Sequence, residues 1–189
     1  MNPAKTRPLP GKAAIAFRAI GVIRSGHVDP EQTPIQPVYA RACRGRVEVA
    51  GEFAAGLRDL EGFSHIFLLY HFHRAAAAAL SVRPFLQDAE RGVFATRSPR
   101  RPNAIGLSLV RLLGREGSVL HIEGGDILDG TPLLDIKPYI ARFDRVAACR
   151  SGWQEEVDEA TARRRGIRRL PSRHAQGKRP SRRQEKNSG

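Results

Sequence analysis

The feature that most constrains the fold is a series of short apolar runs, rich in β-branched residues and separated by glycine, proline and aspartate. Strands bounded by turns have this pattern. Seven such runs lie between residues 15 and 136, at residues 15–23, 46–49, 65–72, 92–96, 107–113, 119–123 and 133–136. The chain therefore predicts a strand-rich domain with frequent reversals of direction.

Segments with helical character are few and short. They are residues 30–32, residues 53–57, and either residues 74–80 or residues 83–88. Parallel strands need a crossover of a dozen residues or more, which none of these segments supplies. The sequence therefore predicts a mainly β fold, a compact antiparallel β-barrel with a few short helices, rather than a doubly wound sheet.

Composition divides the chain into three parts. Residues 1–13 are rich in Pro, Lys and Gly without periodicity and predict a flexible leader. Residues 14–146 carry the apolar runs and predict the folded domain. Residues 147–189 are basic and poor in apolar side chains, so we expect a basic C-terminal tail that is partly disordered.

The formal net charge of +13 is unevenly distributed. Residues 1–149 carry 20 basic and 14 acidic side chains, whereas residues 150–189 carry 12 basic and 5 acidic ones. A field of this sign attracts polyanions, which makes nucleic acid the natural partner and an anionic membrane surface the weaker alternative. Two interpretations of the basic tail stay open: it binds RNA, or it only keeps the protein in solution.

Location and redox state follow from what the sequence lacks. No run approaches the roughly 20 apolar residues of a membrane span, and the first residues have no secretory cleavage pattern. Cys43 and Cys149 lie far apart, without the spacing of a zinc knuckle or a disulfide framework. We therefore expect a soluble, cytoplasmic protein with free thiols and no membrane partner.

Three histidines lie close together in one apolar run. If residues 65–73 form a strand, His65, His71 and His73 lie on one face, because side chains alternate with a period of two. The sharper interpretation is a metal site, yet no H-E-x-x-H motif or cysteine ligand accompanies them. A polar pocket wall or hydrogen-bonded core histidines are the favoured interpretation, and no metal is predicted.

A second candidate region holds Arg97, Arg100 and Arg101 between prolines. Proline restricts the loop, so these guanidinium groups are presented from a stiff platform that suits carboxylate or phosphate oxygens. A solvated turn is the alternative. In residues 126–132, Asp129 and Thr131 are candidates to hold a hydroxyl-bearing ligand, although this segment alone predicts an ordinary turn.

Several common sites lack their signatures. The sequence has no G-x-G-x-x-G after a first strand, no G-x-x-x-x-G-K-[ST] and no G-x-S-x-G. Dinucleotide, nucleoside-triphosphate and hydrolase sites of the usual kinds are therefore not indicated.

Taken together, the motifs resemble the TsaA-like family from about residue 15 to residue 143. The resemblance rests on several motifs in the family's order, of which the sequence holds Ile20-Gly21-Val22-Ile23-Arg24-Ser25, Thr33-Pro34-Ile35-Gln36, residues 56–65, residues 94–99 with Arg101-Pro102-Asn103, Leu128-Asp129-Gly130-Thr131-Pro132, and Asp135-Ile136-Lys137-Pro138-Tyr139. Linked motifs are more specific than any one of them.

This resemblance implies a β-barrel methyltransferase that binds S-adenosylmethionine beside the interface of a homodimer. The implied reaction is N6-methylation of N6-threonylcarbamoyladenosine at position 37 of tRNA. The residues implied to bind the cofactor are Pro34, Ile35, Gln36, Phe72, His73, Arg97, Leu107, Asp129, Gly130, Thr131 and Pro132. Those implied near the substrate or tRNA are Arg100, Arg101, Lys137 and Tyr139.

The chemistry leaves two alternatives for a catalytic base. The sulfonium carries an activated methyl group and mainly needs positioning, whereas the acceptor nitrogen, attached to a carbamoyl carbon, must lose a proton. His73 and Asp135 are the candidates.

Removal of residues 150–189 is expected to leave the barrel folded and able to bind the cofactor.

Two other functions stay open at this point. One is a module that binds S-adenosylmethionine or RNA without turnover on tRNA, and the other is a methyltransferase for a different acceptor.

Overall fold

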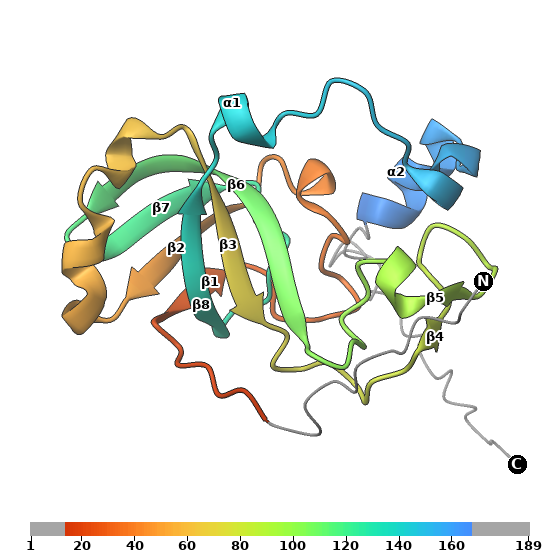
Figure 1. The fold of residues 1–189 in the computed structure, drawn as a ribbon, viewed down its shortest axis with the longest axis horizontal. Helices are drawn as coiled ribbons and strands as arrows, with labels where there is room; N and C mark the ends of the chain where they lie inside the picture. The colour runs from red at the N-terminus through yellow and green to blue at the C-terminus, as the bar shows by residue number, and fades with distance from the viewer. Residues whose placement is uncertain (1–13, 168–189) are drawn as a thin grey trace, which may run out of the picture.

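The computed structural model describes residues 14–167, and six of its strands form one closed antiparallel barrel (Figure 1). The predicted fold class is thereby confirmed. Around the barrel the strands follow the order β1 (Gly21–Ser25), β2 (Arg44–Val49), β7 (Val119–Glu123), β6 (Ile105–Glu116), β3 (His65–His71) and β8 (Thr131–Pro138). Two short strands, β4 (Ser81–Val82) and β5 (Arg91–Gly92), pair separately.

Short helices complete the described part of the chain. The 3-10 helices are η1 (Pro37–Tyr39), η2 (Gly51–Leu57), η3 (Leu60–Gly62), η4 (Val93–Ala95) and η5 (Gly152–Glu156). The α-helices are α1 (Ala141–Asp144) and α2 (Glu159–Ile167). In the described residues no helix has the length and apolar character needed to span a membrane.

The alternation of side chains along the strands explains the barrel. In β3, Ile66, Leu68 and Tyr70 are at most 4% exposed and fill the barrel, whereas Phe67 and Leu69 point to the outside. The same alternation in the other strands brings Ile23, Val47, Val110, Ile122 and Leu133 into the same core.

Four local predictions differ from the structure. Neither residues 74–80 nor residues 83–88 form a helix, since both segments consist of turns, bends and irregular backbone. Residues 92–96 form no long strand, because Val93 is buried in the helical turn η4 and the Thr96 hydroxyl donates a hydrogen bond to its carbonyl. Residues 30–32 form a turn rather than a helix. Residues 14–19 are exposed and precede β1, so the first strand begins only at Gly21.

The antiparallel topology gives the barrel two different ends. At one end lie the loops formed by residues 26–43, 72–104 and 124–130, and we call this the loop end. At the other end, the turn end, residues 50–64 form short 3-10 helices and residues 117–118 form a tight turn. The sequence motifs at residues 33–36, 94–103 and 128–132 therefore meet at the loop end.

The segment predicted as a basic tail, residues 147–189, begins with folded structure. Helices η5 and α2 pack beside the loop end, and Ile35 N donates a hydrogen bond to the carbonyl of Gly166 over 3.2 Å (Figure 1). Residues 152–167 are thus ordered within the segment predicted to be a partly disordered tail. The rest of the predicted tail, residues 168–189, and the predicted leader, residues 1–13, lie outside the described residues.

Candidate functional site

The loop end is joined across its first two loops by one charge-assisted contact. Arg97 Nη1 donates a hydrogen bond of 2.6 Å to Gln36 Oε1, between residues 61 positions apart in the sequence. Both residues were predicted to bind a cofactor. Arg97 remains exposed, so only part of its guanidinium is engaged and other donors face solvent.

A second contact joins the second and third loops. Thr131, 2% exposed, donates its hydroxyl hydrogen to the Leu128 carbonyl over 2.7 Å, and its oxygen lies 3.4 Å from His73 Nδ1. Because the Thr131 hydroxyl hydrogen is already bonded to the Leu128 carbonyl, the Thr131 oxygen accepts a hydrogen bond from the Nδ1–H group of His73. This arrangement places the proton of neutral His73 on Nδ1 and leaves Nε2 as the acceptor.

The pKa of that imidazole is lowered, which favours its neutral form. Desolvation lowers the pKa of His73, and the neighbouring Arg74 and His71 lower it further. At neutral pH the ring is therefore a proton acceptor. Phe72, the preceding predicted residue, packs edge-on against Tyr70 with ring centroids 5.3 Å apart, which fixes the start of the second loop.

Beneath these loops lies a buried polar chain that sequence analysis missed. Ser108 Oγ donates to Asp126 Oδ1 over 2.6 Å and lies 3.0 Å from the Tyr70 hydroxyl, which then donates to Ser108. Burial raises the pKa of Asp126 to about 6, and burial likewise raises the pKa of Tyr70. The Arg97 charge acts on both groups and lowers both pKa values.

Asp126 carried little signal in the sequence. It stands three positions before Asp129 in a polar turn, and that turn drew attention to Asp129 and Thr131 instead. Only the closing of the barrel places Ser108 beneath it and removes it from water. A buried carboxyl group whose perturbed pKa also responds to a nearby guanidinium is the kind of group found at functional sites.

Other predicted residues have mainly structural contacts. Arg101 Nη1 donates 2.7 Å to the Thr96 carbonyl, and Arg100 Nε donates 3.1 Å to the Ala77 carbonyl, so both arginines brace their own loop. The Asp129 carboxylate accepts a hydrogen bond from Ser25 N over 3.1 Å and lies 3.8 Å from Arg24 Nη1. Its side chain therefore faces β1.

The remaining cofactor residues surround this cluster. Pro34 is buried and Ile35 is half-buried, in the loop held by Gly166. Gly130 has φ of 75°, a conformation that favours glycine, and Pro132 begins β8 beside Thr131. Leu107 differs from these residues because it is 54% exposed on the outer face of β6.

Two predicted residues lie away from the loop end. Lys137 lies near the end of β8 and Tyr139 directly follows that strand, so the length of the strand separates both from Thr131 by roughly 20–25 Å. Lys137 Nζ pairs with Asp135 Oδ2 at 2.9 Å on the outside of the barrel. Within one chain, the structure therefore does not bring Asp135, Lys137 or Tyr139 to the His73 cluster.

The three histidines of the apolar run do not converge. His65 begins β3 beside Tyr139, whereas His71 ends that strand, and six residues of strand span roughly 20 Å. Within residues 14–167 no three His, Cys, Asp or Glu side chains are placed to hold a metal ion. Cys43 and Cys149 are free thiols, and burial raises the pKa of Cys43.

Comparison with known proteins identifies the family to which this domain belongs. Residues 22–145 match the family described as the tRNA-methyltransferase O N-terminal domain. The chain belongs to this family. The matched range starts in β1, ends just after α1 and includes every residue of the loop-end cluster, so the TsaA-like resemblance is confirmed.

Individual relatives support the assignment. A Pyrococcus abyssi protein named "Probable S-adenosyl-L-methionine-binding protein" is 53% identical over 142 residues, which cover 75% of this chain and 77% of that protein. The human tRNA (adenine(37)-N6)-methyltransferase is 42% identical over 132 residues, covering 66% of this chain and 30% of the human protein. The crystal structure of TrmO from Pseudomonas aeruginosa superposes with a TM-score of 0.63 at 42% identity, covering 75% of this chain and 63% of that one.

Coverage differs among these family members. The match spans under a third of the human enzyme and under two thirds of the solved TrmO chain. The shared part is the barrel with its loop end. The family domain is thus common to all three, whereas the rest of the longer proteins has no counterpart in the match.

Proposed function

We propose that this protein is an S-adenosylmethionine-dependent methyltransferase that methylates N6 of N6-threonylcarbamoyladenosine at position 37 of tRNA. The observation that carries the proposal is the convergence of three family motifs at the loop end around Arg97, His73 and Asp126. The names of the human enzyme and of the Pyrococcus protein support this substrate and this cofactor.

The loop-end residues fit the cofactor chemically. Arg97 is an exposed guanidinium suited to the cofactor's carboxylate, and the predicted set around it combines apolar side chains, Ile35 and Phe72, with backbone groups of residues 129–132. S-adenosylmethionine would supply a methyl group already activated by its sulfonium. The protein's task is then to hold donor and acceptor in line and to manage one proton.

Geometry favours His73 over Asp135 as the base. His73 lies in the loop-end cluster with Nε2 as its acceptor, and its lowered pKa keeps it neutral. Asp135 is paired with Lys137 at the middle of β8 and lies outside the cluster. In the proposed step His73 Nε2 would accept the proton of the acceptor N–H group as that nitrogen gains a methyl group, and the S–CH3 bond of S-adenosylmethionine would be the bond that breaks.

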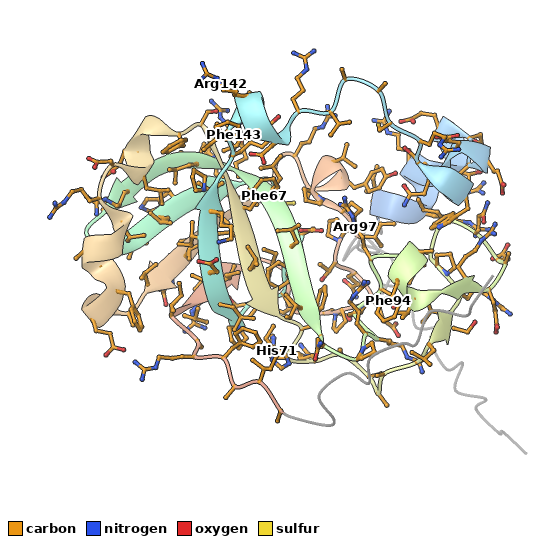
Figure 2. All side chains as sticks on the ribbon, in the orientation of Figure 1. Phe67, His71, Phe94, Arg97, Arg142 and Phe143 are labelled. Carbon is orange, nitrogen blue, oxygen red and sulfur yellow. The ribbon has the colours of Figure 1, made fainter. Side chains whose placement is uncertain are left out.

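The proposal includes a homodimer formed through the outer face of β3, β6 and β8. Figure 2 shows Phe67 on this side of the barrel, and the face also presents Leu69, Leu107 and Leu109 across the register of β3 and β6. Leu107 is 54% exposed in one chain. A contiguous apolar surface of this kind marks an interface, and two-fold pairing is the commonest way for identical chains to cover it.

A dimer of this kind also accounts for the separated substrate residues. Lys137 pairs in register with Phe67, and the Tyr139 ring lies 5.9 Å from the Phe67 ring, so both residues border the apolar face. A second copy on that face would bring its own Lys137 and Tyr139 toward the first. The proposed enzyme is thus a cytoplasmic homodimer with tRNA as its partner.

The dimer is tested by sedimentation of Leu107→Asp against Leu80→Asp. Leu80 is 71% exposed beside β4 and lies outside the proposed face. We expect Leu107→Asp to sediment as a monomer and Leu80→Asp to resemble the wild type. A wild-type monomer at micromolar concentration with full cofactor affinity would overturn the dimer.

The reaction is tested by nucleoside mass spectrometry. Transfer RNA from cells lacking the gene should lose the methylated form of threonylcarbamoyladenosine, and purified protein with S-adenosylmethionine should restore it. His73→Asn should lose methyl transfer to a far greater extent than it loses cofactor affinity. Unchanged modification in the deletion strain would refute the assigned reaction.

A cofactor-binding module without turnover is the second candidate. An Archaeoglobus fulgidus protein named S-adenosyl-L-methionine-binding protein is 39% identical over 130 residues and is covered to 93% of its length. This relative, which consists of little more than the shared domain, is thus named for binding S-adenosylmethionine and not for an enzymatic reaction. Cofactor binding in calorimetry without methyl transfer to any tRNA would favour this alternative.

A further inference from the structure

A row of basic side chains crosses the outer face of β1, β2 and β7. Arg24 lies opposite Arg46 in the register of β1 and β2, and Arg46 lies opposite His121 in the register of β2 and β7. The side chains of Arg24, Arg46 and His121 are 41%, 55% and 42% exposed. Two inter-strand spacings make this row about 10 Å long.

This arrangement costs stability. Like charges directly opposite each other on a sheet repel, so a purely structural face would not pair Arg24 with Arg46. Glu48 offsets the repulsion by accepting from Arg24 Nε at 3.2 Å and from Arg46 Nε at 2.7 Å, and these hydrogen bonds lower the pKa of Glu48. Proteins tend to break local rules of this kind at functional sites.

A neighbouring row repeats the pattern of two arginines to one carboxylate. Glu123 lies 3.8 Å from Arg44 Nε and 3.4 Å from Arg111 Nη1, on strands β2 and β6. Glu48, Glu123 and Asp129 therefore serve four arginines on this face. A guanidinium has five N–H donors, so these pairs leave N–H donors for a further anion.

The surface is hollowed where the first row meets the loop end. A depression of about 340 Å³ is lined by Arg24, Arg44 and Arg46 together with His121 and Asp129. Arg44 is the first residue of β2, and Arg24 is the last but one of β1, so both stand at the loop end. Asp129 belongs to the third loop and connects the depression to the residues beside Thr131.

We infer that this face, which we call the arginine face, binds the phosphate backbone of the tRNA substrate. The inference rests on the proposed function, because it names a contact surface for the same substrate. Several cations in a row suit a chain of phosphates better than a single small anion. In the barrel order β2, the middle strand of the arginine face, lies opposite β3 and borders only β1 and β7, so Arg44 and Arg46 stay accessible when the apolar face is covered by a second copy.

The test compares two double variants in tRNA binding over a series of salt concentrations. Arg44→Gln with Arg46→Gln removes two charges of the arginine face, whereas Arg58→Gln with Arg142→Gln removes two exposed charges elsewhere. Each phosphate contact contributes roughly 0.7–0.9 to the slope of log affinity against log salt. We expect the first variant to lose about 1.5 from that slope and the control to keep it.

Two further measurements distinguish the loss of charge from a structural defect, and a change in tRNA binding from a change in cofactor binding. Lysine at positions 44 and 46 should keep most of the slope, because it preserves the charge. Calorimetry should give the same S-adenosylmethionine affinity for all variants. Parallel salt lines for the arginine-face variant and the wild type, or a wild type that binds no tRNA at low salt, would overturn the inference.

The same data distinguish this inference from the proposed reaction. If tRNA binding depends on Arg44 and Arg46 but no methyl group is transferred, the arginine face stands and the proposed reaction fails. If methylation proceeds and its KM for tRNA is the same in the variant as in the wild type at every salt concentration, the reaction stands and the arginine face fails.

Discussion

The two ends of the barrel are held together in different ways. At the turn end the chain closes on itself through local backbone bonds, such as Phe53 N to Ala50 O at 2.8 Å and Phe63 N to Leu60 O at 3.1 Å. At the loop end the contacts join residues far apart in the sequence, such as Arg97 with Gln36 and His73 with Thr131. The loop end therefore depends on side chains that local sequence alone does not supply.

This difference between the two ends predicts where substitutions should disturb the binding site. A local turn satisfies its own backbone groups, so it tolerates changes of side chain and even of length. A loop positioned by a few long-range hydrogen bonds loses its geometry when one partner is removed, and binding sites are sensitive to displacements of this kind. The following predictions test that contrast in order of decreasing effect.

The largest loss of cofactor affinity is expected from a deletion that removes α2, compared with one that ends the chain just after α2. Deletion of residues 150–189 removes the Gly166 carbonyl that accepts from Ile35 N, and also the paired hydrogen bonds between Arg165 and Asp88 at 3.1 and 3.0 Å. Because the loop that carries Ile35 and Gln36 loses these contacts and shifts, we expect a loss of cofactor affinity of roughly 100-fold or more. Deletion of residues 168–189 should leave that affinity unchanged.

The sequence-based expectation is that deletion of residues 150–189 leaves cofactor binding intact, whereas the contacts of Gly166 and Arg165 favour a loss. Calorimetry of the two truncated proteins decides between them, with circular dichroism as a check that each barrel is folded. Equal affinities would show that α2 only covers the loops.

A smaller loss of cofactor affinity or turnover is expected for Arg97→Ala, with Arg58→Ala as its control. Loss of one charge-assisted hydrogen bond costs about 1.5–3 kcal/mol, which corresponds to roughly 10–100-fold in cofactor affinity or turnover. Arg58 is exposed at the turn end and should have no effect. Arg91 is no neutral control, because it donates to Gln87 over 2.7 Å and lies over the Trp153 ring.

Turnover and calorimetry on the same protein samples give the comparison. Similar losses for Arg97→Ala and Arg58→Ala would mean that the loop end is not the cofactor site.

The pH dependence of stability should also report on the loop end. The pKa of Asp126 is raised to about 6 in the folded protein, against an ordinary value near 3.8. Between these pH values the folded state binds more protons than the unfolded state, so the free energy of unfolding falls as pH rises. At about 1.4 kcal/mol per pH unit, this contribution amounts to at most about 3 kcal/mol.

Asp126→Asn keeps an acceptor for Ser108 and removes the titrating group. Urea unfolding at several pH values should show that the wild type loses stability between pH 4 and 6 relative to this variant. A pH profile shared by the two proteins would place the Asp126 carboxyl in water rather than in the barrel.

The smallest effect is expected at the turn end. Insertion of two glycines between Gly117 and Ser118 lengthens the β6–β7 turn, where Gly117 has φ of 61° and an added Cβ would meet open space. Loop closure grows slowly with length, so the cost should be below about 1 kcal/mol. Thermal unfolding and cofactor affinity should both stay near the wild type, and loss of cofactor binding would contradict the proposed division between the ends.

The sequence by itself determined the class of fold and the approximate place of the site. Alternation in residues 65–71 follows from the period of a strand, and the lack of long helical segments excludes a doubly wound sheet. The loops that hold Arg97 and Thr131 were visible because glycine, proline and charged residues interrupt the apolar runs, whereas Gln36 was indicated only by the family resemblance. Antiparallel strands bring alternate loops to one end. These are local properties of the chain.

Tertiary structure decided the features that depend on contacts between distant segments. Asp126 became a buried acid only because Ser108 on another strand lies beneath it. The basic tail became partly folded because Gly166 meets Ile35, although its composition favours disorder. The arginine face exists because strand register sets Arg24, Arg46 and His121 side by side. Register and burial depend on the closure of the whole barrel, which no local pattern encodes.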